Sequence, residues 1–373
     1  MRTSRKILLC SNYAWTVWNF RLPLIRELRA AGHKVYVLTQ FDGYQNRLES
    51  EVDGVIDLYI SRKGLNPFQD FLTFMQIVFE LTRGRYDFFL PFTIKPVIYG
   101  SLASRLLRVT SIAMITGLGT VFIKKTRITV LVKWLYRFAL KRSGRVFFQN
   151  EEDKAVFLNA GLARPTQSEL VPGSGIDLVK FPQHPFPKSE GFKFLFVGRL
   201  LKDKGIVEFV RAAESVKSIH PEVMFQILGP LGVENRTAVT AEELQKWIDS
   251  GVIDYLGETD EVMSFMAEAK CIVLPSYREG TSRVLLEAAA CGRPIIASNV
   301  PGCKEITRSG VNGFLCEARD PMSLKNEMLR MLQLDEQTLK RFGLESRMIV
   351  EREYSHTFVT EAYLNVLESL KTN

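Results

Sequence analysis

Short apolar runs alternate along the chain with longer segments in which apolar positions recur at helical spacing. The short runs are rich in Ile, Val, Leu and Phe, and this alternation is typical of a parallel sheet flanked by helices. In the first half, the pattern predicts strands at 6–10, 34–38, 56–60, 88–92, 112–115 and 146–149. It predicts helices at 20–31, 67–83, 96–108, 128–141 and 151–160.

The alternation begins again after a Pro-rich stretch at 181–188, which is predicted to be a linker because it can continue neither a strand nor a helix. The second series predicts strands at 192–197, 224–228, 253–256, 272–274, 295–297 and 313–316, and helices at 205–219, 261–269, 282–291 and 321–332. We therefore expect an α/β protein with domains at 1–182 and 183–352. A helix at 353–373, with an apolar stripe, should pack back on the first domain.

Charge divides the chain into two unequal halves. Residues 1–182 carry 26 Lys and Arg against 14 Asp and Glu, a net charge of +12, whereas residues 183–373 carry 23 against 27, a net charge of −4. This asymmetry favours an anionic partner for the first half, either nucleic acid or lipid headgroups. The alternative is a basic surface that serves only solubility.

Cysteine, histidine and hydropathy patterns exclude several classes of protein. The five cysteines form no C-x-x-C pair and suit buried thiols in a reducing compartment, and the four histidines lack metal-ligand spacing. No two aspartates form a D-x-D pair, so we expect neither a metal site nor a cofactor. The apolar run at 7–10 is too short for a signal peptide, and the uncharged stretch at 109–123 is too short to cross a bilayer. We expect a cytoplasmic protein.

A glycine and two cations follow the predicted strand at 192–197. Gly198 lets a ligand approach the backbone, Arg199 and Lys204 add positive charge, and a helix is predicted to begin directly afterwards. This arrangement suits a diphosphate. The alternative is an ordinary basic turn between a strand and a helix.

Two glutamates eight positions apart bracket the start of the predicted helix at 282–291. Glu279 lies in the loop, Ser282 can cap the helix and Glu287 lies inside it. A nucleoside diphosphate could place its phosphates on the backbone amides of 281–284, its ribose on Glu287 and its sugar near Glu279. The alternative role of Glu287 is to interact with the helix dipole, although a carboxylate among Leu and Ala side chains needs a partner.

The order Gly-Arg-Leu…Lys-Gly, then Glu, seven residues, Glu and Cys-Gly-Arg-Pro, resembles the donor site of the retaining GT-B glycosyltransferases, group 1 of family 4. This resemblance implies two facing Rossmann-like domains with a cleft between them, the first binding the acceptor and the second a nucleotide-sugar, preferably a UDP-sugar. It implies that Arg199 and Lys204 neutralise the leaving diphosphate, without metal. Glu279 would contact the donor sugar and Glu287 the ribose. The other expected donor-binding residues are Gly198, Gly229, Gly257, Gly280, Thr281, Ser282, Arg283 and Val284.

The first domain lacks the histidine with which many family members reach the donor sugar; the corresponding loop here contains Thr116, Gly117 and Gly119. That loop, with the segment at 18–23 that includes Asn19 and Arg21, resembles a bacterial subgroup that extends undecaprenyl-diphosphate-linked oligosaccharides, often with N-acetylgalactosamine. These five residues are the expected acceptor or donor-sugar loop. The alternative for the Gly-Leu-Gly loop is a plain tight turn.

The predicted helix at 128–141 combines basic residues with aromatic residues. Its apolar and aromatic side chains include Trp134 and Phe138, and this combination favours reversible association with anionic lipid at the inner face of the cytoplasmic membrane. The expected membrane-facing cations are Lys124, Lys125, Arg127, Lys133, Arg137 and Lys141. The alternative is a solvated helix whose aromatic side chains lie in the core.

Two other functions remain open. A UDP-sugar epimerase of the same two-domain form would consume donor without an acceptor, and a non-catalytic protein could bind anionic lipid. A nucleic-acid partner is not expected, because the cations are not interleaved with a recognisable binding motif. A nicotinamide enzyme is disfavoured because neither Gly117 with Gly119 nor Gly173 with Gly175 completes G-x-G-x-x-G.

Overall fold

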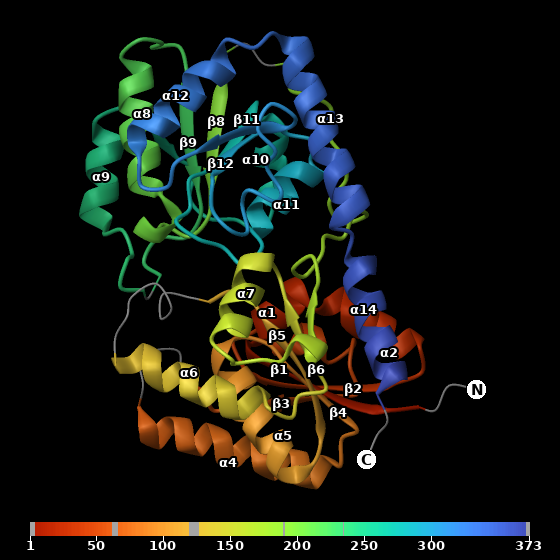
Figure 1. Ribbon diagram of the computed structural model, residues 1–373. Helices are drawn as coiled ribbons and strands as arrows, with labels where there is room; N and C mark the ends of the chain where they lie inside the picture. Colours follow the sequence, from red (N-terminus) through yellow and green to blue (C-terminus); the bar gives the residue numbers. More distant parts are fainter. Residues whose placement is uncertain (1–3, 62–65, 119–126, 189–190, 234, 371–373) are drawn as a thin grey trace. The chain divides into compact units, whose positions relative to one another are not determined.

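The computed structural model describes residues 4–61, 66–118, 127–188, 191–233 and 235–370. The chain divides into a first unit, Met1–Gly175 with His356–Asn373, and a second unit, Ile176–Ser355. Each unit is a parallel sheet covered by helices (Figure 1). The Pro-rich stretch at 181–188 was predicted to be a linker, but it lies inside the second unit. There, Arg293 donates hydrogen bonds to the carbonyls of His184 and Pro185 at 3.2 and 2.6 Å.

The first unit contains a seven-stranded parallel sheet in the order β3-β2-β1-β4-β5-β6-β7. Its strands are β1 (Lys6–Tyr13), β2 (Lys34–Gln40), β3 (Gly54–Asp57), β4 (Phe88–Pro91), β5 (Thr110–Ile115), β6 (Arg145–Phe148) and β7 (Ser168–Leu170). Its helices are α1 (Ala14–Phe20), α2 (Leu22–Ala30), α3 (Gln45–Leu48), α4 (Pro67–Gly84), η1 (Pro96–Gly100), α5 (Ser101–Leu107), α6 (Arg127–Leu140), α7 (Glu151–Asn159), η3 (Pro165–Gln167) and α14 (His356–Ser369).

The second unit contains a six-stranded parallel sheet in the order β10-β9-β8-β11-β12-β13. Its strands are β8 (Lys193–Val197), β9 (Met224–Leu228), β10 (Asp254–Tyr255), β11 (Cys271–Leu274), β12 (Ile295–Ser298) and β13 (Gly313–Cys316). Its helices are η4 (Lys202–Lys204), α8 (Ile206–Lys217), α9 (Ala241–Asp249), α10 (Val262–Glu268), α11 (Arg283–Ala290), α12 (Pro321–Leu332) and α13 (Glu336–Glu353). Both sheets have the strand order of a Rossmann-like fold, so the prediction of two such domains is confirmed.

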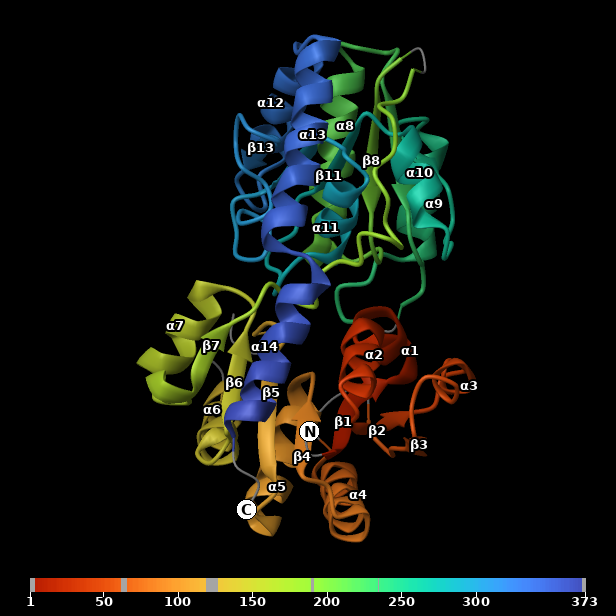
Figure 2. The same cartoon turned by 90° about the vertical axis from the view of Figure 1, so that its right-hand side faces the viewer.

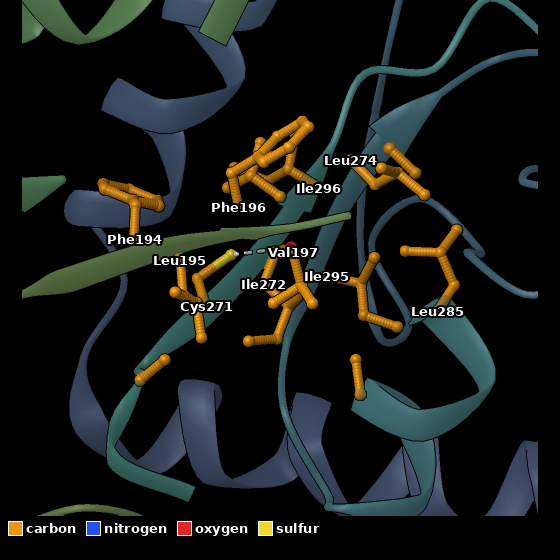
Figure 3. Packing of buried hydrophobic residues seen from close by; sticks show 14 of the residues in the cluster. Phe194, Leu195, Phe196, Val197, Cys271, Ile272, Leu274, Leu285, Ile295 and Ile296 are labelled. Carbon is orange, nitrogen blue, oxygen red and sulfur yellow. Dashed lines mark hydrogen bonds between the residues drawn. The ribbon is translucent and has the colours of Figure 1, made fainter. Parts of the chain in front are cut away.

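Buried apolar side chains from the strands form the core of the second unit, and Figure 3 shows residues of β8, β11 and β12 together with Leu285 of α11, all members of one buried cluster. Helix α14, which follows the second unit in the sequence, packs back on the first unit and contributes to its core. Tyr363 of α14 is fully buried, and its ring centroid lies 4.7 Å from that of Phe147 in β6. Figure 2 shows α14 alongside β5 and β6, although about 200 residues of sequence or more separate α14 from these strands.

Two predicted helices of the first unit differ in detail from the structure. The predicted helix at 20–31 corresponds to α2, and α1, which ends one residue before Arg21, was not predicted; Pro23 lies in the first turn of α2, where proline is well tolerated. The segment at 18–23 is therefore not a loop. The predicted helix at 96–108 begins with the π-helical turn η1 and continues as α5.

Candidate functional site

Two loops meet at the carboxyl ends of β8 and β11, where the strand order of the second sheet reverses. This is the position at which open α/β sheets bind ligands. The backbone N–H of Tyr277 donates to the carbonyl of Asp203 at 2.9 Å. A Cβ on Gly205 would lie 2.0 Å from the carbonyl oxygen of Pro275, so only glycine permits this approach. The loop at 198–205 and the loop at 275–282 therefore form one packed unit.

The two loops bring Lys204 and Glu279 into direct contact. Lys204 Nζ lies 2.5 Å from Glu279 Oε1, and both side chains are largely buried. The sequence predicted that each would contact a ligand but not that they would contact each other. In this pair the ammonium and the carboxylate neutralise one another, and each still has hydrogen-bonding capacity for a further polar partner.

Arg199 differs from Lys204 in its surroundings. It is exposed, and its guanidinium makes no hydrogen bond or ion pair with any residue that the structure describes. Arg199 directly follows Gly198, whose backbone N–H donates to Leu228 at 2.9 Å. The guanidinium is thus held near the end of β8 by its backbone alone and is available to an anion.

Three glycines form a continuous row across the ends of β8, β9 and β10. The backbone N–H of Gly229 donates to the carbonyl of Gly257 at 2.8 Å, and a Cβ on Gly229 would lie 1.9 Å from the carbonyl oxygen of Gly198. The hydroxyl of Tyr255 donates to the carbonyl of Gly229 at 3.0 Å. Because glycine has no side chain, a flat ligand could lie directly against the backbone of this row at this edge of the sheet.

The carboxylate of Glu287 has a partner inside its own helix. Arg283 Nε lies 2.8 Å from Glu287 Oε1, and the Arg283 guanidinium lies over the ring of Phe181 at 4.9 Å. The Ser282 hydroxyl accepts from the backbone N–H of Leu285 at 3.4 Å, as predicted for a helix cap. The partner that the sequence required for Glu287 is therefore Arg283, one turn earlier.

A third loop, which sequence reasoning missed, supports the glutamate loop. The backbone N–H groups of Glu279 and Ser282 donate to the carbonyls of Pro301 and Gly302 at 3.1 and 2.9 Å. The expectation that the Ser282 amide serves a phosphate is therefore wrong for this arrangement, because that amide already has an acceptor. Gly302 lies in the left-handed region, and its Cβ would lie 2.5 Å from the carbonyl oxygen of Gly280. The Pro-Gly pair at 301–302 was the signal for this turn.

Tyr277 joins the glutamate loop to helix α8. Its hydroxyl donates to Glu208 Oε1 at 2.8 Å, and the Arg319 guanidinium lies over its ring at 4.6 Å. Burial, together with Glu208, raises the pKa of Tyr277 to about 12. Tyr277 therefore remains a neutral hydrogen-bond donor that fixes the loop, and nothing in the sequence motif indicated this role.

In the first unit, only part of the predicted sugar loop can be placed. Arg21 is buried, with its guanidinium 4.2 Å from the ring centroid of Phe92, and the amide of Asn19 donates to the carbonyl of Trp15 at 3.0 Å. Thr116 and Gly117 follow β5, and Gly119 lies outside the described residues. Arg21 therefore stabilises the unit through a cation–π contact instead of lying in an exposed loop.

Thr93 is a further feature at the strand-order reversal of the first sheet. It has a φ of 68°, which is rare for a β-branched residue, and its hydroxyl donates to Asn12 Oδ1 at 2.9 Å. Asn12 and Thr93 lie at the carboxyl ends of β1 and β4. Sequence reasoning missed both because neither belongs to a motif.

Helix α6 turns Trp134 and Phe138 outward, so the alternative that placed these two aromatic side chains in the core is wrong; the third aromatic residue of the helix, Tyr136, is buried. Trp134 and Phe138 are 56% and 39% exposed. Lys133 is half-buried, Lys141 is exposed, and Arg137 Nε donates to the carbonyl of Gly161 at 3.1 Å. Arg127 begins the helix, and Lys124 and Lys125 lie outside the described residues.

A cavity of about 280 Å³ lies between the C-terminal end of α6 and the segment at 161–167. Among the residues that the structure describes, its charged lining consists of Arg137, Lys141 and Arg164, and its other lining includes Phe138 and Leu162. Two of these cations already have protein partners, since Arg137 donates to the carbonyl of Gly161 and Arg164 to the side chain of Gln167.

Across the described ranges, no helix is long and apolar enough to cross a bilayer. In the same ranges, no three His, Cys, Asp or Glu side chains are grouped so that they could hold a metal ion.

Comparisons with known families match most of the chain. Residues 180–347 match the model of glycosyl transferases group 1, and residues 6–150 match that of the glycosyl transferase 4-like family. The chain is 26% identical to the N,N'-diacetylbacillosaminyl-diphospho-undecaprenol alpha-1,3-N-acetylgalactosaminyltransferase of Campylobacter jejuni, over 96% of this chain and 97% of that protein. It is also 26% identical to the UDP-Gal:alpha-D-GlcNAc-diphosphoundecaprenol alpha-1,3-galactosyltransferase of Escherichia coli, over 72% of each.

Solved structures support the fold. The crystal structure of Anabaena HepE in complex with UDP and glucose matches with a TM-score of 0.80 at 19% identity, covering 98% of this chain and 100% of that one. Sucrose-phosphate synthase from Thermosynechococcus elongatus matches with a TM-score of 0.78 at 19% identity and the same coverage.

Proposed function

Because the chain belongs to the GT-B glycosyltransferases, with a glycosyl transferase 4-like domain followed by a group 1 domain, we propose that it transfers a sugar from a UDP-sugar to a polyprenyl-diphosphate-linked glycan. The sugar is a hexose or N-acetylhexosamine such as GalNAc, and the product serves bacterial surface-glycan synthesis. Two relatives support this proposal, since both are named for α-1,3 transfer to undecaprenyl-diphosphate-linked sugars.

The observation that carries the proposal is the packing of the two loops at the ends of β8 and β11, which gathers Arg199, Lys204 and Glu279 at one edge of the sheet. In the proposed reaction, the bond between the anomeric carbon and the UDP oxygen breaks. An acceptor hydroxyl bonds to the same face of that carbon, and its proton passes to the departing phosphate. Positive groups fixed around developing charge typically contribute a few kcal/mol, roughly 10²- to 10³-fold in rate.

Each donor-site residue has a proposed role. Arg199 approaches the diphosphate from solvent, and Lys204 divides its charge between Glu279 and the phosphate. Glu279 accepts hydrogen bonds from the sugar hydroxyls, and Glu287, already oriented by Arg283, accepts from the ribose. The row of Gly198, Gly229 and Gly257 lies against the nucleotide. No metal or other cofactor takes part in this proposal, because the cations and helix amides stabilise the leaving group.

We also propose that the enzyme works as a peripheral protein on the inner face of the cytoplasmic membrane. The exposed side chains of Trp134, Phe138 and Lys141 on α6 support this location, since the acceptor of such an enzyme is anchored in the bilayer.

The test is turnover of a panel of UDP-sugars by purified protein in detergent and EDTA, with and without an undecaprenyl-diphosphate-linked saccharide. Acceptor-dependent release of UDP from one sugar supports the proposal and identifies the donor. An α linkage in the product, read from its anomeric proton signal, supports retention because the donor is α-linked. Turnover without acceptor would instead identify an epimerase. No turnover or binding across the panel would leave a non-catalytic lipid-binding role.

A further inference from the structure

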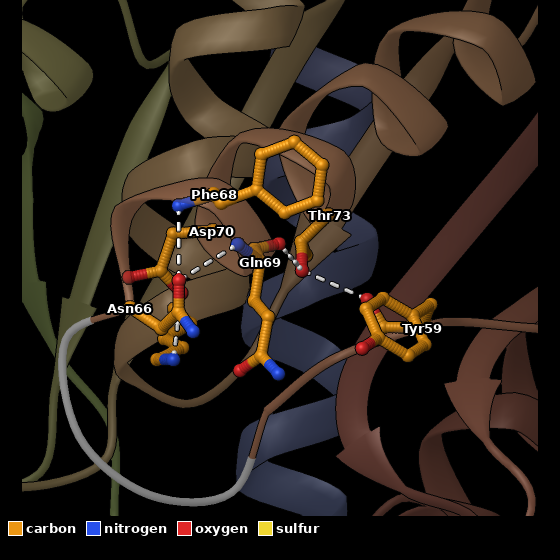
Figure 4. Close-up of polar contacts among 7 residues, drawn as sticks. Tyr59, Asn66, Phe68, Gln69, Asp70 and Thr73 are labelled. Carbon is orange, nitrogen blue, oxygen red and sulfur yellow. Dashed lines mark hydrogen bonds and ion pairs between the residues drawn. The ribbon is translucent and has the colours of Figure 1, made fainter.

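Helix α4 carries its polar residues on the side that faces the rest of the first unit. Asp70 lies 2.7 Å from Lys95 Nζ, and Glu80 accepts from the hydroxyl of Tyr86 at 2.8 Å. The Thr73 hydroxyl donates to the carbonyl of Tyr59 at 2.8 Å (Figure 4). At its start, Asn66 accepts from two backbone N–H groups, and these are also drawn in Figure 4. These contacts fix the rotation of α4 about its own axis.

The outward side of α4 is apolar. Its exposed side chains recur at intervals of three and four, the spacing of one helical face. We call this set the α4 stripe: Phe68, Phe71, Leu72, Met75 and Phe79, which are 69, 56, 40, 44 and 62% exposed. Both charged residues of 67–82, Asp70 and Glu80, are buried, so no charge interrupts the stripe. A contiguous apolar patch of this kind marks an interaction surface, unlike isolated exposed residues.

The chain next to the stripe is strongly basic. Residues 88–150 contain eleven Lys and Arg and no Asp or Glu. This acid-free stretch includes α5 and α6; α5 packs on α4, and Arg105 of α5 donates to the carbonyl of Phe138 in α6 at 3.1 Å. Figures 1 and 2 both show α4, α5 and α6 as neighbouring helices of the first unit.

We infer that the α4 stripe inserts among the lipid chains of an anionic bilayer while the basic residues of α5 and α6 bind the headgroups. An apolar, aromatic helix face beside a surface of one positive sign is the pattern of an interfacial helix. A second copy of this chain fits less well, because a twofold interface through the stripe would bring two acid-free basic stretches together. The anionic bilayer satisfies both the apolar face and the charge.

This inference rests on the proposed membrane location and adds how the protein is held there. Electrostatic attachment through α6 alone would be lost at high salt, whereas insertion of five large apolar side chains would persist. The two modes can therefore be separated by salt and by substitution on each helix.

The first test measures co-sedimentation of the full chain with vesicles of phosphatidylcholine, with or without phosphatidylglycerol, at low salt and in about 0.5 M NaCl. The double variant Phe71→Ser/Phe79→Ser should bind anionic vesicles roughly tenfold more weakly or worse and lose its salt-resistant fraction, because two large apolar groups are removed. Leu344→Ser is the matched control, since Leu344 is 54% exposed on α13 of the second unit. Unchanged, salt-resistant binding by the double variant would overturn the inference.

The second test reports on insertion directly and needs no turnover, so a failed search for a donor sugar does not affect it. All five native cysteines are buried, so an environment-sensitive dye can be attached selectively to Phe71→Cys. Its emission should shift to the blue when anionic vesicles are added, while dye on Leu344→Cys should not shift. The inference is overturned by an unshifted dye on vesicle-bound protein. It is equally overturned by light scattering that shows a dimer which Phe71→Ser dissociates.

Discussion

Lys204 and Glu279 lie 75 positions apart in the sequence, and their ion pair depends entirely on how two loops pack. Each residue could be predicted from its place beside a glycine and a strand. Their contact could not, because it follows from a close backbone approach between Gly205 and Pro275 that leaves no trace in local sequence. The Arg283–Glu287 pair, in contrast, has the spacing of neighbouring helical turns and could have been predicted.

Arg199→Ala should lower kcat about 10²-fold or more without destabilising the fold, because an exposed guanidinium is removed from the leaving diphosphate. The measurements are UDP release and thermal unfolding. Lys202→Ala is the matched control, since Lys202 lies three residues away but pairs with Glu243 at 2.7 Å. Equal turnover by the Arg199 and Lys202 variants would remove Arg199 from the proposed site.

Gly229→Ala should destabilise the protein by about 3 kcal/mol or more, because the new Cβ would meet a neighbouring backbone oxygen that cannot move freely. Gly257→Ala should cost only about 1 kcal/mol, since Gly257 has a positive φ and no described residue has an atom within 4 Å of its Cβ position. Urea unfolding of both variants measures the difference. Equal losses would show that the close approach of Gly198 and Gly229 is relaxed in solution.

At the scale of helices and strands, the apolar pattern predicted most elements of both sheets; the bounds of β9, β13 and α12 are confirmed to the residue. It failed where an element is very short, as for α3 and the three-residue, half-buried strand β7. Three longer helices, α1, α9 and α13, were also missed. The α9 capping box, with Thr240 and Glu243 bonding reciprocally, was a readable signal.

Tyr363 of α14 offers a matched pair of substitutions. Tyr363→Ala should destabilise the first unit by about 3–5 kcal/mol, because it leaves a cavity beside Phe92 and Phe147. Tyr363→Phe should change stability by less than about 0.5 kcal/mol or increase it, since the hydroxyl is buried with no hydrogen-bond partner in the described part of the chain. Calorimetry of the two variants distinguishes the outcomes. A large loss for Tyr363→Phe would point to a buried water on the hydroxyl.

Across the whole molecule, the sequence predicted two Rossmann-like domains because each half has its own alternation of strands and helices. It placed the division at 182–183, within a Pro-rich stretch, whereas contacts divide the chain at 175–176 and again at 355–356. Composition cannot locate such a division, because it depends on which core each side chain enters. Phe181, for example, is buried in the core of the second unit.

The cysteines of both units give a prediction for the entire chain. At pH 7.5, a thiol reagent should modify none of the five rapidly in the native protein and all five in denaturant. Burial raises the pKa of Cys291 to about 11 and that of Cys316 to about 12, so the folded protein keeps these protons longer than the unfolded chain does. Their contribution to stability is complete below pH 9 and declines as the pH rises towards 11.

The measurement for this prediction is urea unfolding across pH 8 to 11, compared with Cys291→Ser/Cys316→Ser, which should show a shallower decline. Fast modification of any native thiol at pH 7.5 would contradict the burial on which the argument rests.

The position of α14 after the second unit in the sequence has a consequence for biosynthesis. Domains usually fold in the order in which the ribosome delivers them. Here the second unit, Ile176–Ser355, is fully translated before α14, which supplies Val359, Tyr363 and Val366 to the core of the first unit. The unit whose translation begins first therefore cannot complete its core until the second unit has been translated.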